Sequence, residues 1–318
     1  MNRRSRSFGL VLLGLTSITQ LGCQTAPPVV PRSGPKSALP PVALLPREHD
    51  FVLRFDVARL RTVIGPEGVL ALAKSTLPPD HAALASILSG KANVVWAGVS
   101  LVEGGSSAVI VARGDGAALD PTAWMAADRK PFAVRDNGDA GVRWFDRTAE
   151  ASAKDPERLL WLEGGTLASV SRSQIAPVER ELGATSDSGR LAPKEDALIA
   201  FAARKPALAA GLGVKDKRMA EAMSYATSLE GLVDVVGEEL QMELLFGFSR
   251  SDVARDVTEG VQRLLAQLRA GRNQAAATIA ANAGAARVGG TKVRVRFVLP
   301  REKLKAILLS SATLPQGG

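Results

Sequence analysis

Few residues of the types that carry out catalysis or bind metals occur in this chain. Among its 318 residues the sequence holds one cysteine, Cys23, and two histidines, His49 and His81. The histidines stand too far apart for a zinc-binding H-x-x-x-H or H-E-x-x-H spacing, and a single cysteine cannot build a cysteine-rich zinc site. His49 precedes an expected strand and His81 lies near an expected helix start, so we expect surface or capping roles for both. The sequence therefore predicts no metal site and no cofactor.

The motifs that signal hydrolase or nucleotide chemistry are also missing from the sequence. No serine lies in a G-x-S-x-G elbow, and neither a G-x-x-x-x-G-K-[ST] loop nor a G-x-G-x-x-G turn after a strand occurs. The neighbouring carboxylates Glu238 and Glu239 could act as acid and base, but they fall at an expected hairpin tip, where water solvates both. We predict no catalytic residue and a non-enzymatic protein. The alternative is a hydrolase-type site of scattered polar residues, or a lipid-carrying cavity, in a cleft between two halves.

Cys23 lies at the end of an expected secretory signal, a position where a cysteine thiol can be modified covalently. Three arginines between positions 3 and 6 form a positive n-region, and residues 8–15 form an apolar h-region. That apolar run is shorter than the roughly 20 residues that a membrane-spanning helix needs. We therefore expect residues 1–22 to be a signal peptide that is removed, rather than a permanent transmembrane helix.

The run Leu21-Gly22-Cys23 resembles the end of the lipobox of bacterial lipoproteins. The resemblance implies transfer of diacylglycerol to the Cys23 thiol, cleavage before that residue, and a lipid anchor with acyl chains such as palmitate. The sequence departs from the family at Gln20 and Leu21, where an aliphatic and a small residue are usual. The alternative is a free cysteine beside an ordinary secretory cleavage site, for which residues 24–26 are a poor match.

The residue after Cys23 bears on the membrane in which such an anchor would sit. It is Gln24 rather than aspartate, and the resemblance to Gram-negative lipoproteins then implies export to the outer membrane. We expect a protein of the cell envelope that is lipid-anchored at the periplasmic face of the outer membrane. Overall the chain resembles the many uncharacterised lipoproteins of Gram-negative bacteria, and residues 47–318 resemble no characterised family. The Cys23 signal, the proline-rich segment and the missing catalytic motifs lead us to expect a non-enzymatic binding or scaffolding module of the envelope.

Proline dominates the segment that follows the expected cleavage point. Residues 23–46 contain seven prolines. Proline restricts φ and removes an amide donor, so this composition favours an extended, polyproline-II-like chain over packed structure. We expect the segment to be a tether that holds a globular body away from a membrane.

The composition indicates that the rest of the chain folds. Hydrophobic residues make up 46% of the sequence and aromatic residues only 4%, so alanine, valine and leucine must fill the core. The net charge of +8 falls to +5 once the three signal arginines are removed, and no dense block of lysine and arginine occurs. Nucleic-acid binding is therefore not expected. With one cysteine the fold must hold by packing, without an internal disulfide.

The chain after residue 46 predicts an α+β fold of two similar halves, residues 47–190 and 191–318. Each half is expected to form an antiparallel sheet with helices packed on one face. The first half has expected strands at 50–57, 92–102, 106–113, 132–135, 141–146, 158–162 and 166–171, and expected helices at 58–74, 80–88, 122–127 and 173–182. Asp120 can cap the helix at 122–127, with Pro121 in its first turn.

The second half has the element order of a ferredoxin-like βαββαβ unit. Its expected elements are strands at 197–203, 229–236, 240–248 and 291–299, helices at 215–227 and after a cap at Ser249 or Ser251, and a final helix after Pro300. Residues 271–290 are rich in alanine and glycine, which indicates a frayed helix or a loop.

Three cations alternate with apolar residues in the last expected strand. Lys292, Arg294 and Arg296 therefore share one face of the sheet, and we call them the basic ladder. The basic ladder could meet an anionic lipid, lipopolysaccharide or an acidic envelope protein. The alternative is a solvated sheet face that acidic residues of the neighbouring strand balance. The expected partners are thus the membrane, through Cys23, and an envelope protein or anionic lipid.

Overall fold

The computed structural model describes residues 39–76, 84–102, 105–124, 131–135, 141–149, 151, 156–184, 189–204, 221, 223–271 and 274–301. These residues form two units that divide between Ala192 and Pro193, which we call the N-terminal and the C-terminal unit. Antiparallel strands and helices make up both units, so the predicted α+β class is confirmed. Cys23 and the expected signal peptide lie outside the described residues.

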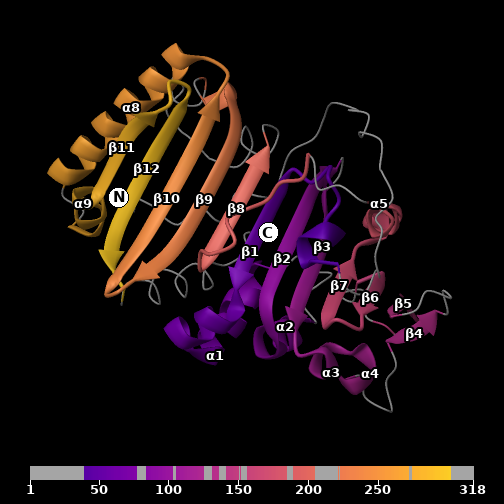
Figure 1. Cartoon of the computed structure of the whole chain (residues 1–318). Helices are drawn as coiled ribbons and strands as arrows, with labels where there is room; N and C mark the ends of the chain where they lie inside the picture. The colour runs from indigo at the N-terminus through magenta and orange to yellow at the C-terminus, as the bar shows by residue number, and fades with distance from the viewer. Residues whose placement is uncertain are drawn as a thin grey trace, which may run out of the picture. The chain divides into compact units, whose positions relative to one another are not determined.

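Seven antiparallel strands form the described sheet of the N-terminal unit (Figure 1). Their spatial order is β1, β2, β3, β7, β6, β5, β4. The strands are β1 (Phe51–Asp56), β2 (Ala92–Val102), β3 (Gly105–Gly114), β4 (Phe132–Arg135), β5 (Val142–Arg147), β6 (Arg158–Leu162) and β7 (Thr166–Val170). Successive residues of a strand point to opposite faces, yet Val52 and Leu53 are both buried. Both faces of the sheet are therefore covered at β1.

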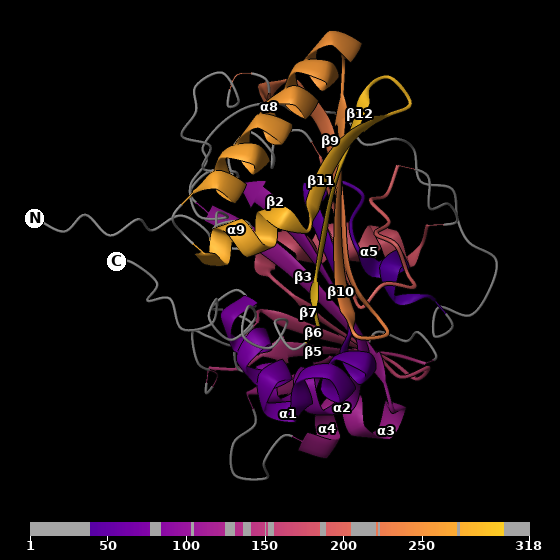
Figure 2. The same ribbon diagram turned by 90° about the vertical axis from the view of Figure 1, so that its left-hand side faces the viewer.

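Helices cover both faces of this sheet. In Figure 2, α1 (Val57–Thr76) and α2 (Ala85–Lys91) lie on one side, and α5 (Ile175–Leu182) lies on the other. The prediction that helices pack on one face is therefore wrong for this unit, because its central strands bury apolar side chains in both directions. Helix α1 is broken at Gly65, where φ is +81°, directly before Pro66. The shorter helices are α3 (Gly116–Leu119), α4 (Pro121–Trp124) and η4 (Arg172–Gln174).

The first described residues pack into the core of the N-terminal unit. The 3-10 helix η2 (Pro41–Leu44) lies against β3 and α5, and Ala43, Leu44 and Leu45 are fully buried. The same core cluster includes Val52, Trp96, Val109, Val111, Leu160, Val170 and Val178. The prediction that the tether reaches residue 46 is therefore wrong for residues 39–46. Burial of the apolar side chains between the prolines outweighs the extended preference of the backbone.

Five antiparallel strands form the described sheet of the C-terminal unit, in the spatial order β11, β12, β10, β9, β8. They are β8 (Ile199–Arg204), β9 (Ala226–Val236), β10 (Glu239–Phe248), β11 (Ala283–Val288) and β12 (Lys292–Pro300). Leu240 lies opposite Val235 of β9 and Leu299 of β12, so neighbouring strands build one apolar face. Helices α8 (Ser251–Ala270) and α9 (Gln274–Ala281) lie on one side of this sheet (Figure 1, Figure 2).

The last strand of the C-terminal unit joins the sheet as predicted, but the ferredoxin-like arrangement is wrong. β12 pairs with β10, as expected. A ferredoxin-like unit would place its first strand between the third and the fourth, whereas β8 pairs with β9. Residues 271–290 contain α9 and the additional strand β11, which the low strand propensity of alanine and glycine conceals.

Two predicted helices of this half lie mostly outside the described residues. Of the helix expected at 215–227, residues 215–220 are not described, and Ala226 and Thr227 belong to β9 instead. The final helix expected after Pro300 also lies beyond the described part of the chain.

Candidate functional site

The described chain begins with a segment that packs against the N-terminal unit and leads into β1. We call this segment, residues 39–49, the strap. It contains η2, where the Leu45 amide donates to the Val42 carbonyl at 3.1 Å and the carbonyls of Ala43 and Leu45 follow at the end of the helix. Because the strap is buried, those carbonyls need donors from elsewhere in the fold.

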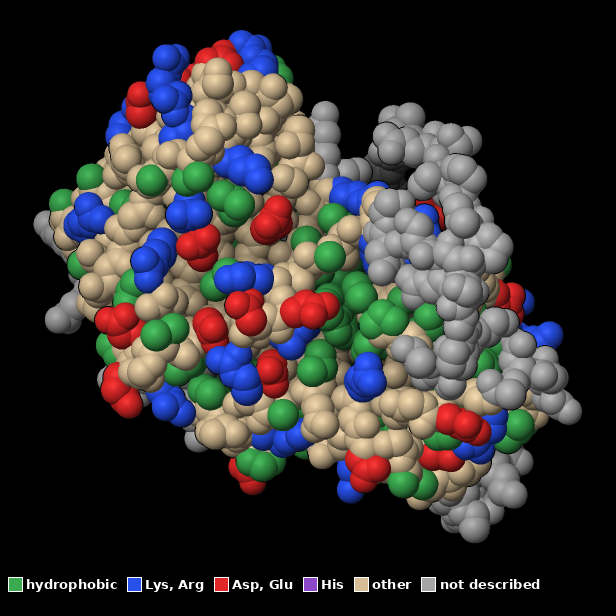
Figure 3. All heavy atoms as spheres, in the orientation of Figure 1, with side chains coloured by type: hydrophobic (Ala, Val, Ile, Leu, Met, Phe, Trp, Pro, Cys, Tyr) green, Lys and Arg blue, Asp and Glu red, His purple; other side chains and the backbone are tan. Residues whose placement is uncertain are grey.

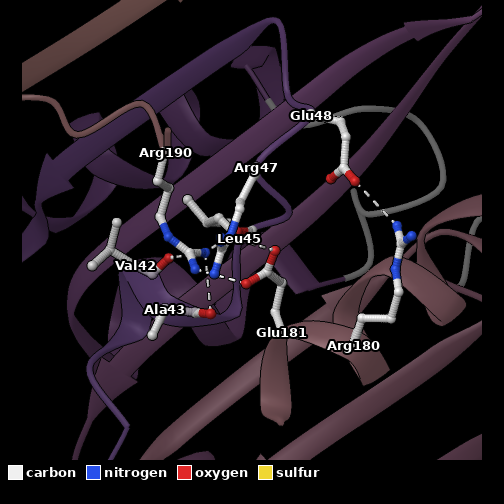
Figure 4. A network of polar contacts seen from close by, with 8 residues as sticks. All are labelled: Val42, Ala43, Leu45, Arg47, Glu48, Arg180, Glu181 and Arg190. Carbon is white, nitrogen blue, oxygen red and sulfur yellow. Dashed lines mark hydrogen bonds and ion pairs between the residues drawn. The ribbon is translucent and has the colours of Figure 1, made fainter. Parts of the chain in front are cut away.

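Arg190 supplies these donors (Figure 4). Its Nη1 donates to the carbonyl oxygens of Val42 at 3.0 Å and Ala43 at 3.1 Å, and also to that of Leu45. Its Nη2 donates to Oε2 of Glu181 at 2.8 Å. One guanidinium thus caps the end of η2 and binds a carboxylate from α5, which suits its planar, multidentate geometry.

Glu181 joins the strap to α5 through a second arginine. Its Oε1 lies 3.3 Å from Nε of Arg47. The side chains of Arg47, Glu181 and Arg190 are each no more than 5% exposed, and we call the three the strap cluster. Removing charges from water costs several kcal/mol for each ion, so the cluster is stable only because each charge has a partner within it. Outside it, Arg180 and Glu48 form an exposed ion pair at 3.1 Å, again between α5 and the strap.

His49 ends the strap in a buried position. Its side chain is 1% exposed and its Nδ1 lies 2.8 Å from Oγ of Ser100 on β2. The ring lies over Gly98, since a Cβ at that position would stand 2.1 Å from Cδ2 of His49. The expected surface or capping role is therefore wrong for His49, because the glycine on the neighbouring strand leaves room for the ring. His81 lies outside the described residues.

The strap cluster can fix the chain in place but offers no group for catalysis. The terminal nitrogens of Arg190 bind the η2 carbonyls and the Glu181 carboxylate, which also pairs with Arg47. No sequence pattern predicts this cluster, because positions 47, 181 and 190 come together only through the fold. The signal that could have revealed the strap is the apolar run of Ala43, Leu44 and Leu45 among the prolines.

The basic ladder lies on the exposed face of the C-terminal sheet, where acidic and basic side chains mix (Figure 3). Nε of Arg294 lies 3.1 Å from Oε1 of Glu243, and Nη2 of Arg296 donates to Oε1 of Gln241 at 2.8 Å. Both partners belong to β10, the neighbouring strand. The structure thus shows for Arg294 the charge balance that the sequence analysis gave as the alternative to an anionic partner.

A third polar group stands at the start of α4 in the N-terminal unit. Oδ1 of Asp120 accepts from the Thr122 amide at 2.9 Å, which confirms the predicted cap, and Arg143 forms an ion pair with Oδ2. The Arg143 guanidinium also lies 4.1 Å from the centre of the Trp161 ring. Burial alone would raise the pKa of Asp120, but the hydrogen bonds from Thr122 and Arg143 outweigh it and lower the pKa below its ordinary value.

Two further classes of site are not found in the described part of the chain. There, no cluster of three or more His, Cys, Asp and Glu side chains has the arrangement that holds a metal ion. None of the described helices is long and apolar enough to cross a membrane.

Comparison with solved structures finds a similar fold in TP0453. Neither protein-family models nor curated protein sequences match the chain. Crystal form I of TP0453 is similar to it with a TM-score of 0.51 and 9% sequence identity, over 87% of this chain and 99% of that one. Crystal forms III and IV of TP0453 give TM-scores of 0.46 and 0.48 at 10% and 11% identity. At this identity the likeness concerns the fold alone.

Proposed function

We propose that this chain is a lipoprotein of the cell envelope, anchored by acyl chains on Cys23, that acts through its surface as a non-enzymatic binding or scaffolding module. The run Leu21-Gly22-Cys23 after an apolar segment supports the anchor. Gln24 at the next position supports a location at the periplasmic face of the outer membrane.

The strap cluster is the observation that carries this proposal. A lipid anchor transmits membrane motion to the body through the first residues that the body holds. The first described residues are the strap, which Arg190 and Glu181 bind through buried contacts at 2.8 to 3.3 Å. Segments near the ends of a domain are usually poorly ordered unless they are tied down, and the strap is fixed by ions whose burial is costly.

The pKa values of two described carboxylates, Asp120 and Asp252, are lowered. Catalytic acids and bases typically have pKa values moved toward neutrality. The side-chain hydrogen bond from Arg250 lowers the pKa of Asp252, and that of Asp120 is lowered as well. Both shifts stabilise the ordinary charged form, which suits structural ion pairs.

Labelling of the native protein with a palmitate analogue tests the anchor. We expect the full chain and a Thr25→Ala control to incorporate the label and to fractionate with the outer membrane, and Cys23→Ala to take up none. A second variant, Gln24→Asp, is expected to keep the label but to move to the inner membrane. If Cys23→Ala is labelled like the control, or if the unaltered chain is not labelled, the anchor is not on this thiol.

A further inference from the structure

The strand β11 presents an edge of the C-terminal sheet whose outward backbone groups can be assigned. Among the described residues, β11 pairs only with β12. The Val298 amide donates to the Asn282 carbonyl at 2.9 Å, and hydrogen-bonded and non-bonded pairs alternate along an antiparallel ladder. Gly284, Ala286 and Val288 therefore bond to β12. It follows that Ala283, Ala285 and Arg287 turn their N–H and C=O groups toward the open side.

Two of these outward carbonyls accept hydrogen bonds from side chains of α8. Nε2 of Gln262 donates to the Ala285 carbonyl at 3.0 Å, and Nη2 of Arg269 donates to the Ala283 carbonyl at 2.7 Å. The two side chains stand where the amides of a further strand would donate. Covering an edge in this way is a known protection against unwanted strand pairing, and flexible side chains can be displaced by a suitable segment.

A groove runs between α8 and this edge. It has a volume of about 340 Å³ and is lined by Gln262, Leu265, Arg269, Gly284 and Ala285. Leu265 is buried beneath it. The groove therefore has room for small aliphatic side chains on the helix side of an added strand.

On the face of the sheet that points away from α8, β11 lies beside the basic ladder. Gly284 lies opposite Arg296 and Ala286 opposite Arg294, so these small residues share the face of the two arginines. A Cβ at Gly284 would meet nothing within 4 Å. An added strand would lie two strand spacings from β12, roughly 10 Å. Across the small residues of β11, an acidic side chain on the added strand can reach an arginine of the ladder.

We propose that the open edge of β11 binds an extended peptide segment by strand addition, with acidic side chains toward the basic ladder and small apolar side chains toward α8. This proposal specifies the kind of partner that the binding module would take, and it therefore rests on the proposed function. Main-chain hydrogen bonds give affinity in this mode of recognition, and alternate side chains give specificity.

Charge favours an acidic segment over the other occupants of this edge. Two copies of this chain paired through β11 would bring their basic ladders together, and like charges repel. A broad anionic membrane would also face Glu230, Asp234 and Glu243, which lie on the same side of the sheet as the ladder. An acidic strand added beside β11 can contact the arginines of the ladder without facing these carboxylates.

Binding of a designed peptide to the full-length protein in detergent tests the proposal. The probe is an acetylated peptide of sequence TEVEVET, and its lysine counterpart TKVKVKT is the control. We expect TEVEVET to bind in low salt at least about tenfold more tightly than the control, and added salt to weaken that binding. Amide hydrogen exchange of residues 283–288 is expected to slow when TEVEVET is bound, since the Ala285 and Arg287 amides gain acceptors.

Two substitutions separate the backbone and the charge contributions. Ala285→Pro removes an outward amide and leaves the ladder to β12 intact, because proline is tolerated on that side of an edge strand. We expect it to weaken binding of TEVEVET by at least about tenfold, while Ala285→Ser, which keeps the amide, has little effect. Arg296→Gln is expected to weaken binding several-fold without any change to the strand, which the circular dichroism spectrum checks.

Three results would overturn the proposal. They are absence of TEVEVET binding, equal binding to Ala285→Pro and Ala285→Ser in folded proteins, and unchanged hydrogen exchange at residues 283–288 in the presence of bound peptide. Binding to phosphatidylglycerol vesicles but not to TEVEVET would assign the ladder to a membrane instead. Palmitate labelling at Cys23 is independent of all these measurements, so failure of this site and failure of the anchor are distinguishable.

Discussion

The strap cluster and the basic ladder use the same chemistry, arginine paired with glutamate, in opposite environments. In the strap cluster Arg190 and Glu181 are 2% and 4% exposed, whereas in the ladder Arg294 and Glu243 are 45% and 30% exposed. Water and salt screen the exposed pair, and its members can exchange partners at small cost. The buried charges have no such freedom, because each loses its hydration and depends on the others. The comparison indicates that the first region fixes the chain while the second remains available for binding.

Substitution of the central carboxylate should give the largest effect. Glu181→Gln removes the carboxylate that the buried guanidinium groups of Arg47 and Arg190 share. We expect the free energy of unfolding to fall by about 3–5 kcal/mol, as for other broken buried ion pairs. Denaturant unfolding measures the loss.

Glu48→Gln is the matched control, because it removes an exposed carboxylate that also joins the strap to α5. Its pair with Arg180 is 41% and 56% exposed on the two sides, so we expect a loss below about 1 kcal/mol. Equal losses in Glu181→Gln and Glu48→Gln would show that burial does not decide the strength of these contacts.

Asp120 is intermediate in exposure between the strap cluster and the basic ladder, and its contribution to stability depends on pH. Its pKa is lowered from the ordinary value of 3.8, so the carboxylate stabilises the fold above that value and the contribution is lost as pH falls through the folded-state pKa. Asp120→Ala should cost about 1–2 kcal/mol at pH 7 through loss of the cap. Asparagine can still cap the helix, so Asp120→Asn should lower the free energy of unfolding by less than Asp120→Ala. In Asp120→Asn this free energy should depend less on pH between about 5 and 2. Denaturant unfolding at several pH values across this range measures the free energy of unfolding. If its pH dependence is the same in Asp120→Asn as in the unaltered chain, the Asp120 carboxylate does not stabilise the fold.

The smallest effect is expected on the ladder itself. Arg294→Gln removes the partner of Glu243, and we expect the free energy of unfolding to change by less than about 1 kcal/mol. Thermal unfolding measures this change. A loss as large as that of Glu181→Gln would mean that the ladder is structural rather than available for a partner.

Regular side-chain alternation is what made much of the fold predictable. The period-two pattern from Leu240 to Phe248 predicted β10 and its apolar face, and the same period placed Lys292, Arg294 and Arg296 on one face of β12. Where composition opposed the final structure, the prediction was wrong. Prolines concealed the packed strap, and alanine and glycine concealed β11, because in both places tertiary contacts decide the local conformation.

The strap cluster could not be predicted because no local pattern connects its members. Arg190 donates to carbonyls as far as 148 positions away in the sequence. Charged side chains are also mostly exposed in proteins, so nothing about Glu181 in an amphipathic helix signals that it is 4% exposed. Only the path of the strap across α5 explains its burial.

The intact mass of the N-terminal peptide from the native protein tests the proposed anchor most directly. We predict a peptide that starts at Cys23 and carries a diacylglyceryl group on its sulfur. A protein that still begins at Met1, or a Cys23 thiol without acyl chains, would contradict the assignment of this chain to the envelope.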